Sequence, residues 1–185
     1  QHVPGETLDL DIVYERVLVD ADGEQWLFTI GKDGILWKLD RRTGAFVDLR
    51  ETVYQDIFGS IDRTTGELTY RENLQDIAIG ERVFACPSLL GGHNWQPMSY
   101  SPLTGLVYVP AQEIQGAYRL DPDFEYRPGE FNTGTDMNVF ALSTREVVSG
   151  HLLAWDPVAQ KEAWRQQHGL PWNGGTLATA GHLVV

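Results

Sequence analysis

The chain has 185 residues, of which 42% are hydrophobic, so it can form one domain with a buried core and is not a disordered chain. Its formal net charge of −12 argues against a nucleic-acid-binding surface, because affinity for phosphates rests on lysine and arginine. The single cysteine, Cys86, excludes an internal disulfide framework and a CxxC site for zinc or haem, and no apolar run is long enough for a transmembrane helix.

The two ends of the sequence indicate a piece of a longer protein. Gln1 is not an initiator methionine, and residues 176–185 finish on an apolar run that reads as a strand. We therefore expect an internal fragment, for which a missing targeting segment says nothing about the compartment.

Strand-like runs with turn residues between them fill most of the chain. Residues 14–19, 25–30 and 35–40 are such runs, and Asp33-Gly34 between two of them is a strong hairpin signal. Only residues 162–168 have a pattern that would support a short helical turn. With 19 glycines and 9 prolines to make turns, the sequence predicts an all-β fold.

One turn motif recurs. Residues 40–44, 62–66 and 101–105 each place Thr-Gly three residues after an Asp or Ser, and residues 154–164 contain a degenerate fourth copy. In such a turn the Asp side chain caps the backbone and Gly supplies a positive φ. A hairpin unit repeated at tens of residues is typical of a β-propeller, and a run of unrelated hairpins in a sandwich is the alternative. Residues 111–137 break the pattern and read as a long loop insertion, either functional or a tolerated surface insertion.

Two segments have unusual polar residues. Asp9 and Asp11 point the same way if their segment is extended, and paired carboxylates attract a hard cation, although a solvated strand edge is the default reading. In residues 86–102, small residues lead into His93-Asn94-Trp95-Gln96. That set would suit the rim of a pocket for a flat polar ligand, or a structured loop.

The repeated hairpins, residues 86–102 and the ending 172–184 together resemble the pyrroloquinoline-quinone (PQQ)-dependent alcohol dehydrogenases of the methanol and ethanol dehydrogenase type. The resemblance covers nearly the whole chain apart from residues 111–137. It implies that residues 1–185 are an internal fragment of a single PQQ-binding catalytic domain, an eight-bladed β-propeller of which about three blades are present.

The resemblance also assigns roles to single residues. It implies that Asp9 is the catalytic base and a metal ligand, and that Asp11 is the extra metal ligand typical of lanthanide-using members. Leu8 and Leu10 depart from the family pattern, which has aromatic residues there. The residues that would contact the cofactor are Lys32, Asn94, Trp95 and Trp172. Lys32 could instead be an exposed turn lysine, and Trp155 and Trp164 read as packing residues.

The implied activity is oxidation of a primary or other small alcohol to the aldehyde, with hydride transfer to metal-bound PQQ. The cation would be Ca²⁺ or a lanthanide, the electron acceptor a cytochrome c-type protein, and the compartment the periplasm; any haem c would lie outside this chain. The remaining ligands would lie upstream, so we expect the chain alone to be inactive. The alternatives are a non-catalytic propeller scaffold and a sugar- or polyol-oxidising quinoprotein.

Overall fold

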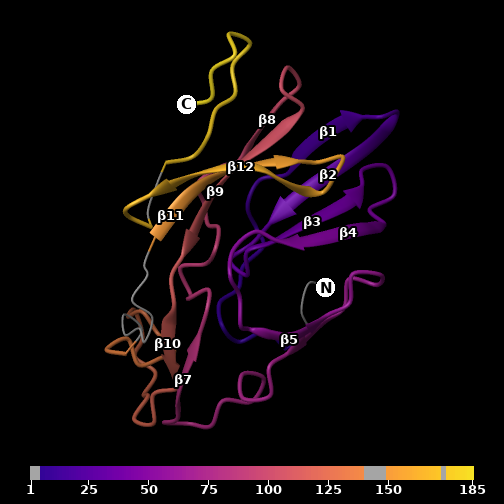
Figure 1. Ribbon diagram of the computed structural model, residues 1–185. Helices are drawn as coiled ribbons and strands as arrows, with labels where there is room; N and C mark the ends of the chain where they lie inside the picture. The colour runs from indigo at the N-terminus through magenta and orange to yellow at the C-terminus, as the bar shows by residue number, and fades with distance from the viewer. Residues whose placement is uncertain (1–4, 140–148, 172–173) are drawn as a thin grey trace.

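The computed structural model describes residues 5–139, 149–171 and 174–185 (Figure 1). Within those ranges the chain has twelve strands and no helix, so the all-β prediction is confirmed. It follows that no described segment is a helix that could cross a membrane.

Two four-stranded antiparallel sheets form the body of the molecule. The first is a meander of β1 (Val17–Ala21), β2 (Glu24–Ile30), β3 (Ile35–Asp40) and β4 (Phe46–Glu51). The second has the order β12-β11-β9-β8, with β8 (Ser99–Ser101), β9 (Leu106–Glu113), β11 (Ser149–Asp156) and β12 (Lys161–His168). The two sheets lie side by side and touch where β1 meets β8 (Figure 1).

Two small antiparallel pairs complete the described fold. β5 (Phe58–Ile61) pairs with β6 (Leu68–Tyr70), and β7 (Arg82–Ala85) pairs with β10 (Gly116–Arg119). In the view of Figure 1, β5 lies below the first sheet, whereas β7 and β10 lie at the lower left, below β9.

Two apolar cores hold these elements together. One joins the two large sheets and includes Phe28, Ile30, Val107 and Leu153. The other joins the first sheet to the small pairs and to residues 5–14. Buried side chains in this second core include Leu8, Leu10, Ile35, Leu49, Ile57 and Tyr118. Burial of that many aliphatic side chains is the main stabilising contribution, at about 1.5–3 kcal/mol each.

The recurring turns fold as the sequence predicts. The Asp40 side chain accepts hydrogen bonds from the backbone N–H groups of Arg42 and Thr43, at 2.8 and 2.9 Å, between β3 and β4. Asp62 and Asp156 cap the β5–β6 and β11–β12 turns in the same way. The degenerate copy has Gln160 at the glycine position, and Gln160 keeps the left-handed backbone with φ 51°.

Three local expectations were wrong. Residues 162–168 belong to β12 and not to a helical turn, because neighbouring β11 offers them a full hydrogen-bonded ladder. The loop predicted over 111–137 begins later: Ala111 to Glu113 finish β9, residues 116–119 form β10, and the irregular stretch starts at Leu120. Residues 176–185 form only an isolated bridge between Ala178 and Val184 instead of a strand.

Candidate functional site

Asp9, Asp11 and Lys32 meet in one cluster. The ammonium group of Lys32 donates to Oδ2 of Asp9 at 2.7 Å and to Oδ2 of Asp11 at 2.8 Å. The two carboxylates therefore converge on one cationic atom, although 23 and 21 residues separate them from Lys32. The structure brings together the three charged residues that the sequence singled out.

The segment that carries the two aspartates is positioned by its apolar neighbours. Leu8 and Leu10 are 1% and 2% exposed in the core beside the first sheet, so the alternating Asp9 and Asp11 face outward. This burial accounts for apolar residues at positions 8 and 10. Asp9 itself has a left-handed backbone, with φ 62°, which is uncommon for a residue other than glycine.

Lys32 is fixed by its backbone as well as by its side chain. Its N–H donates to the carbonyl of Asp11 at 2.9 Å, and its own carbonyl accepts the N–H of Gly92 at 2.8 Å. A Cβ on Gly91 would lie 2.7 Å from Cα of Lys32, so only glycine permits this approach. Lys32 thus joins the aspartate segment to the loop at 86–98.

The Lys32 side chain is 10% exposed, whereas those of Asp9 and Asp11 are 59% and 47% exposed. Burial acts to lower the pKa of Lys32, but the hydrogen bonds to Asp11 and Asp9 outweigh it and raise the pKa above its ordinary value. Lys32 is therefore a fixed positive charge and not an exposed turn lysine.

The predicted cofactor residues Asn94 and Trp95 follow Gly92, whose N–H binds the Lys32 carbonyl, but their side chains have separate contacts. The amide of Asn94 donates to the carbonyl of Leu90 at 2.9 Å, which also accepts the side-chain amide of Gln112 at 2.7 Å. Trp95 is 66% exposed. Trp172 lies outside the described residues.

Sequence reasoning missed Tyr14, Glu15 and the part that His93 plays. Burial raises the pKa of the Tyr14 hydroxyl; Lys32 opposes this shift, and the charges of Asp11 and Asp9 add to it, so Tyr14 borders the charged cluster. The Tyr14 ring packs edge-on against the imidazole of His93, with ring centroids 5.8 Å apart. No motif marks Tyr14 or Glu15, and the contact of Tyr14 with His93 joins positions far apart in the chain.

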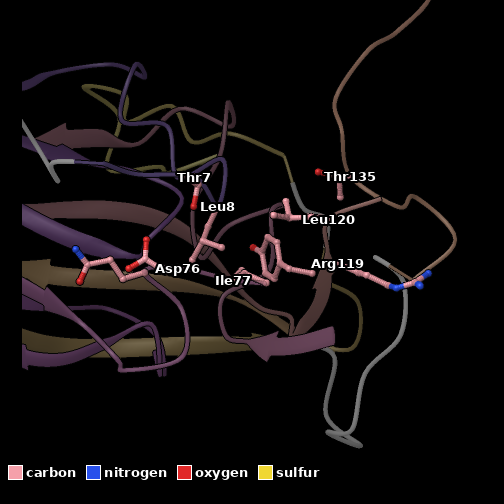
Figure 2. Close-up of a pocket in the computed structure, with 9 residues that line it drawn as sticks. Thr7, Leu8, Asp76, Ile77, Arg119, Leu120 and Thr135 are labelled. Carbon is pink, nitrogen blue, oxygen red and sulfur yellow. The ribbon is translucent and has the colours of Figure 1, made fainter. Parts of the chain in front are cut away.

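A cavity of about 430 Å³ opens beside Asp9. Apolar side chains and threonine hydroxyls line it together with Asp9 and Glu6: Thr7, Leu8, Leu89, Tyr118, Phe131, Thr133, Thr135 and Met137. A smaller pocket of about 230 Å³ adjoins it and shares Thr7, Leu8, Tyr118 and Thr135. In Figure 2, Leu8 and Leu120 approach that pocket from different segments. The irregular stretch after Leu120 therefore forms one wall beside Asp9, which favours the functional reading of the predicted loop over a plain surface insertion.

Comparison with known proteins identifies relatives of this chain. No protein-family profile matches the chain. The chain is 36% identical, over 187 residues, to the dehydrogenase subunit of the quinone alcohol dehydrogenase of Gluconacetobacter polyoxogenes, covering 96% of the chain and 25% of that subunit. It is also 36% identical, over 201 residues, to quinohemoprotein alcohol dehydrogenase ADH IIB of Pseudomonas putida, covering all of the chain and 27% of that enzyme.

The chain is a homologue of the quinoprotein alcohol dehydrogenases. The resemblance seen in the sequence is thereby confirmed. The chain spans about a quarter of the length of these relatives. Its fold matches the solved quinohemoprotein alcohol dehydrogenase of Comamonas testosteroni with a TM-score of 0.75 and 34% identity, over 91% of this chain and 26% of that one. A europium-containing methanol dehydrogenase shares the fold, with a TM-score of 0.78 at 24% identity over 97% of this chain and 32% of that one.

The donor groups of this quinoprotein homologue fit part of a cation and quinone site. Two carboxylates that already converge on one positive charge are the hard oxygen donors that Ca²⁺ and lanthanides prefer. Within the described part of the chain no cluster of three or more His, Cys, Asp or Glu side chains could hold a metal, so Asp9 and Asp11 supply only part of the ligand set. Lys32 uses two ammonium hydrogens on the aspartates, which leaves one for a quinone oxygen.

Proposed function

We propose that the protein containing this chain oxidises a primary or other small alcohol to the aldehyde, with PQQ and a Ca²⁺ or lanthanide ion as cofactors. The observation that carries the proposal is the convergence of Asp9 and Asp11 on Lys32 at the mouth of a cavity. The homology to alcohol dehydrogenases over nearly the whole chain supports it.

The roles of this chain's own residues follow from the geometry. Lys32 binds Oδ2 of Asp9 and orients the carboxylate, which leaves Oδ1 to accept the hydroxyl proton of an alcohol in the adjoining cavity. The ammonium would also provide a fixed positive charge for a cofactor oxygen bound beside it. The bound quinone would supply the hydride acceptor, and the cation would polarise its carbonyl.

The cavity supports a small alcohol as the substrate. Leu8, Leu89 and Phe131 provide an apolar wall for a short carbon chain, and Thr133 and Thr135 provide hydroxyl groups. We propose that Asp9 meets the hydroxyl end of the substrate at the edge of this wall.

The wider assembly is also a proposal. The two four-stranded sheets would be two blades, and the small pairs part of a third, in an eight-bladed propeller completed by the rest of the protein; the TM-scores of 0.75 and 0.78 support this path of the chain. A cytochrome c-type electron acceptor is supported by a relative named 1-butanol dehydrogenase (cytochrome c), from Thauera butanivorans, 33% identical to this chain. We place the protein in the periplasm on the family resemblance.

Substitution of Asp9 tests the proposal. In the full-length enzyme with PQQ and metal saturating, Asp9→Asn keeps the side-chain shape but removes the proton acceptor, so kcat should fall by roughly 10²–10⁴-fold. The matched control is Asp22→Asn, since Asp22 also has a left-handed backbone, φ 53°, but lies in the exposed β1–β2 turn. A non-catalytic scaffold would show no alcohol oxidation in either protein, and an Asp9→Asn enzyme as active as the control would refute the role of Asp9.

A further inference from the structure

One carboxylate oxygen holds both ends of the loop 93–98. Oε1 of Glu15 accepts the backbone N–H of Met98 at 2.6 Å and lies 3.5 Å from Nε2 of His93. Between these two residues the loop carries Asn94 and Trp95, both expected to contact the cofactor. Glu15 itself lies four residues after Asp11 on the aspartate segment.

The two ring nitrogens of His93 face two different oxygen acceptors, and Glu15 is one of them. The His93 side chain is fully buried, and Nδ1 lies 2.9 Å from the carbonyl oxygen of Pro110 on β9. Nε2 is buried and makes no hydrogen bond to any residue that the structure describes, and the acceptor it faces is Oε1 of Glu15. The imidazole thus lies between two oxygen acceptors, the Pro110 carbonyl and the Glu15 carboxylate, and Glu15 is the acceptor that Nε2 faces.

The electrostatics of Glu15 agree with this arrangement. Burial acts to raise the pKa of the Glu15 carboxyl, but the interaction with His93 and the hydrogen bond from the Met98 amide outweigh it and lower the pKa. The carboxylate is three-quarters buried, with 26% of its side chain exposed, so the pair is poorly screened by solvent.

The same loop receives a further part of the candidate site. The N–H of Thr176 donates to the carbonyl of Pro97 at 2.7 Å, and Gly175 packs against the Pro97 ring so closely that a Cβ there would clash. A shift of the loop would therefore displace the segment that follows Trp172 as well.

We infer that Glu15 and His93 are a pair of positioning residues that hold the loop 93–98 in register with the Asp9–Asp11–Lys32 cluster. Neither reaches the cluster itself; they set the distance between the charged groups on one segment and the cofactor-side groups on the other. The expected effect of the pair on cofactor binding and turnover rests on the proposed function. The expected position of the loop 93–98 is independent of that function.

The variant Glu15→Gln separates the charge from the shape of the side chain. The single atom at the Oε1 position must serve both Met98 and His93. An amide oxygen there could still accept the Met98 N–H but provides no negative charge for His93, and an amide nitrogen there would oppose Met98. Glu67→Gln is the matched control. Glu67 is exposed in the turn between β5 and β6, and it is remote in sequence from the loop 93–98.

The experiment uses the full-length protein labelled with 5-fluorotryptophan and observed by fluorine NMR, first without cofactor or alcohol. The Trp95 signal is assigned by Trp95→Phe, and the Trp37 signal, from β3, reports whether the fold is intact. We expect Glu15→Gln to shift or broaden the Trp95 signal and leave the Trp37 signal unchanged, with His93→Gln giving the same change and Glu67→Gln giving none. A Trp95 signal that matches wild type in both Glu15→Gln and His93→Gln would overturn the inference, as would equal changes at Trp95 and Trp37.

The functional measurement is made separately. In Glu15→Gln we expect the dissociation constant for PQQ to rise, or kcat to fall, by about 10–100-fold while the KM for the alcohol stays within about twofold, because the pair acts on the cofactor side. A rise in KM alone would contradict that assignment. A wild-type protein that neither binds PQQ nor oxidises alcohols would refute the proposed function and leave the NMR test of the pair intact.

Discussion

At the scale of single residues, the candidate site depends on an alternation that the sequence shows directly. Leu8 and Leu10 are buried and Asp9 and Asp11 are exposed, so the predicted common direction of the carboxylates holds although the segment is not a regular strand. The sequence also predicts that the two carboxylates have a positively charged partner, because close carboxylates repel each other without one. Only the fold shows that Lys32 is the residue that supplies this charge.

Asp11 should decide which ion the site prefers. A trivalent lanthanide attracts each carboxylate more strongly than Ca²⁺ in proportion to its charge, and both ions accept many oxygen ligands. In metal-free full-length protein reconstituted with La³⁺ or Ca²⁺, Asp11→Ala should reduce the La³⁺-dependent rate far more than the Ca²⁺-dependent rate. Asp22→Ala is the control for loss of an exposed carboxylate. Equal losses with both ions, or no loss with either, would show that Asp11 does not select the metal.

At the scale of strands and turns, local chemistry was sufficient to predict most hairpins. The Asp40 and Asp62 turns form because the side chain caps the backbone and glycine follows in the left-handed region. The errors arose where a neighbour overrides local pattern: residues 162–168 follow the ladder of β11, and residues 116–119 pair with β7, which lies more than 30 residues earlier. Such pairings have no short-range signal.

The loop at 86–98 reaches Lys32 only because Gly91 has no side chain. Gly91→Ala would place a Cβ 2.5 Å from the His93 carbonyl and 2.7 Å from Cα of Lys32, in addition to the strain of alanine at φ 80°. Gly44→Ala is the matched control, since φ is 74° there and no atom lies within 4 Å. The control should lose about 1–2 kcal/mol of stability from backbone strain alone.

In the full-length enzyme we expect Gly91→Ala to lower the unfolding midpoint in urea more than Gly44→Ala does, and to reduce kcat by about tenfold or more because Lys32 and the loop separate. Equal midpoints and equal rates for the two variants would mean that the close approach has no consequence.

At the scale of the whole molecule, the sheets are joined by apolar contacts that also bury polar groups. The charged cluster and the positioning pair join residues 21 to 83 positions apart, which is why the sequence indicated Asp9, Asp11 and Lys32 by type but gave no sign of Glu15. His151 on β11 is another residue whose state is set by packing, because it lies between β9 and β12 and is fully buried.

The burial of His151 predicts a dependence of stability on acid. Burial, with a smaller contribution from the charge of Arg165, lowers the pKa of His151 from 6.5 to about 4. The unfolded chain therefore binds more protons than the folded chain between these two values, and the free energy of unfolding falls as the pH drops through that window. For one proton the slope approaches about 1.4 kcal/mol per pH unit. Above pH 6.5 this dependence fades, because the imidazole of the unfolded chain loses its proton as well.

The measurement is the urea unfolding midpoint of the full-length protein between pH 4 and pH 8 for wild type and for His151→Leu. Leucine has no proton to bind, so the difference between the two curves isolates this one group. We expect the variant to lose less stability than wild type below pH 6.5 and to run parallel to it above. His168→Leu is the control, because His168 is exposed on β12 and pairs with the residue next to His151. This variant should lose the same stability as wild type below pH 6.5. If His151→Leu and His168→Leu give the same acid limb, the buried imidazole is not the source of the acid sensitivity.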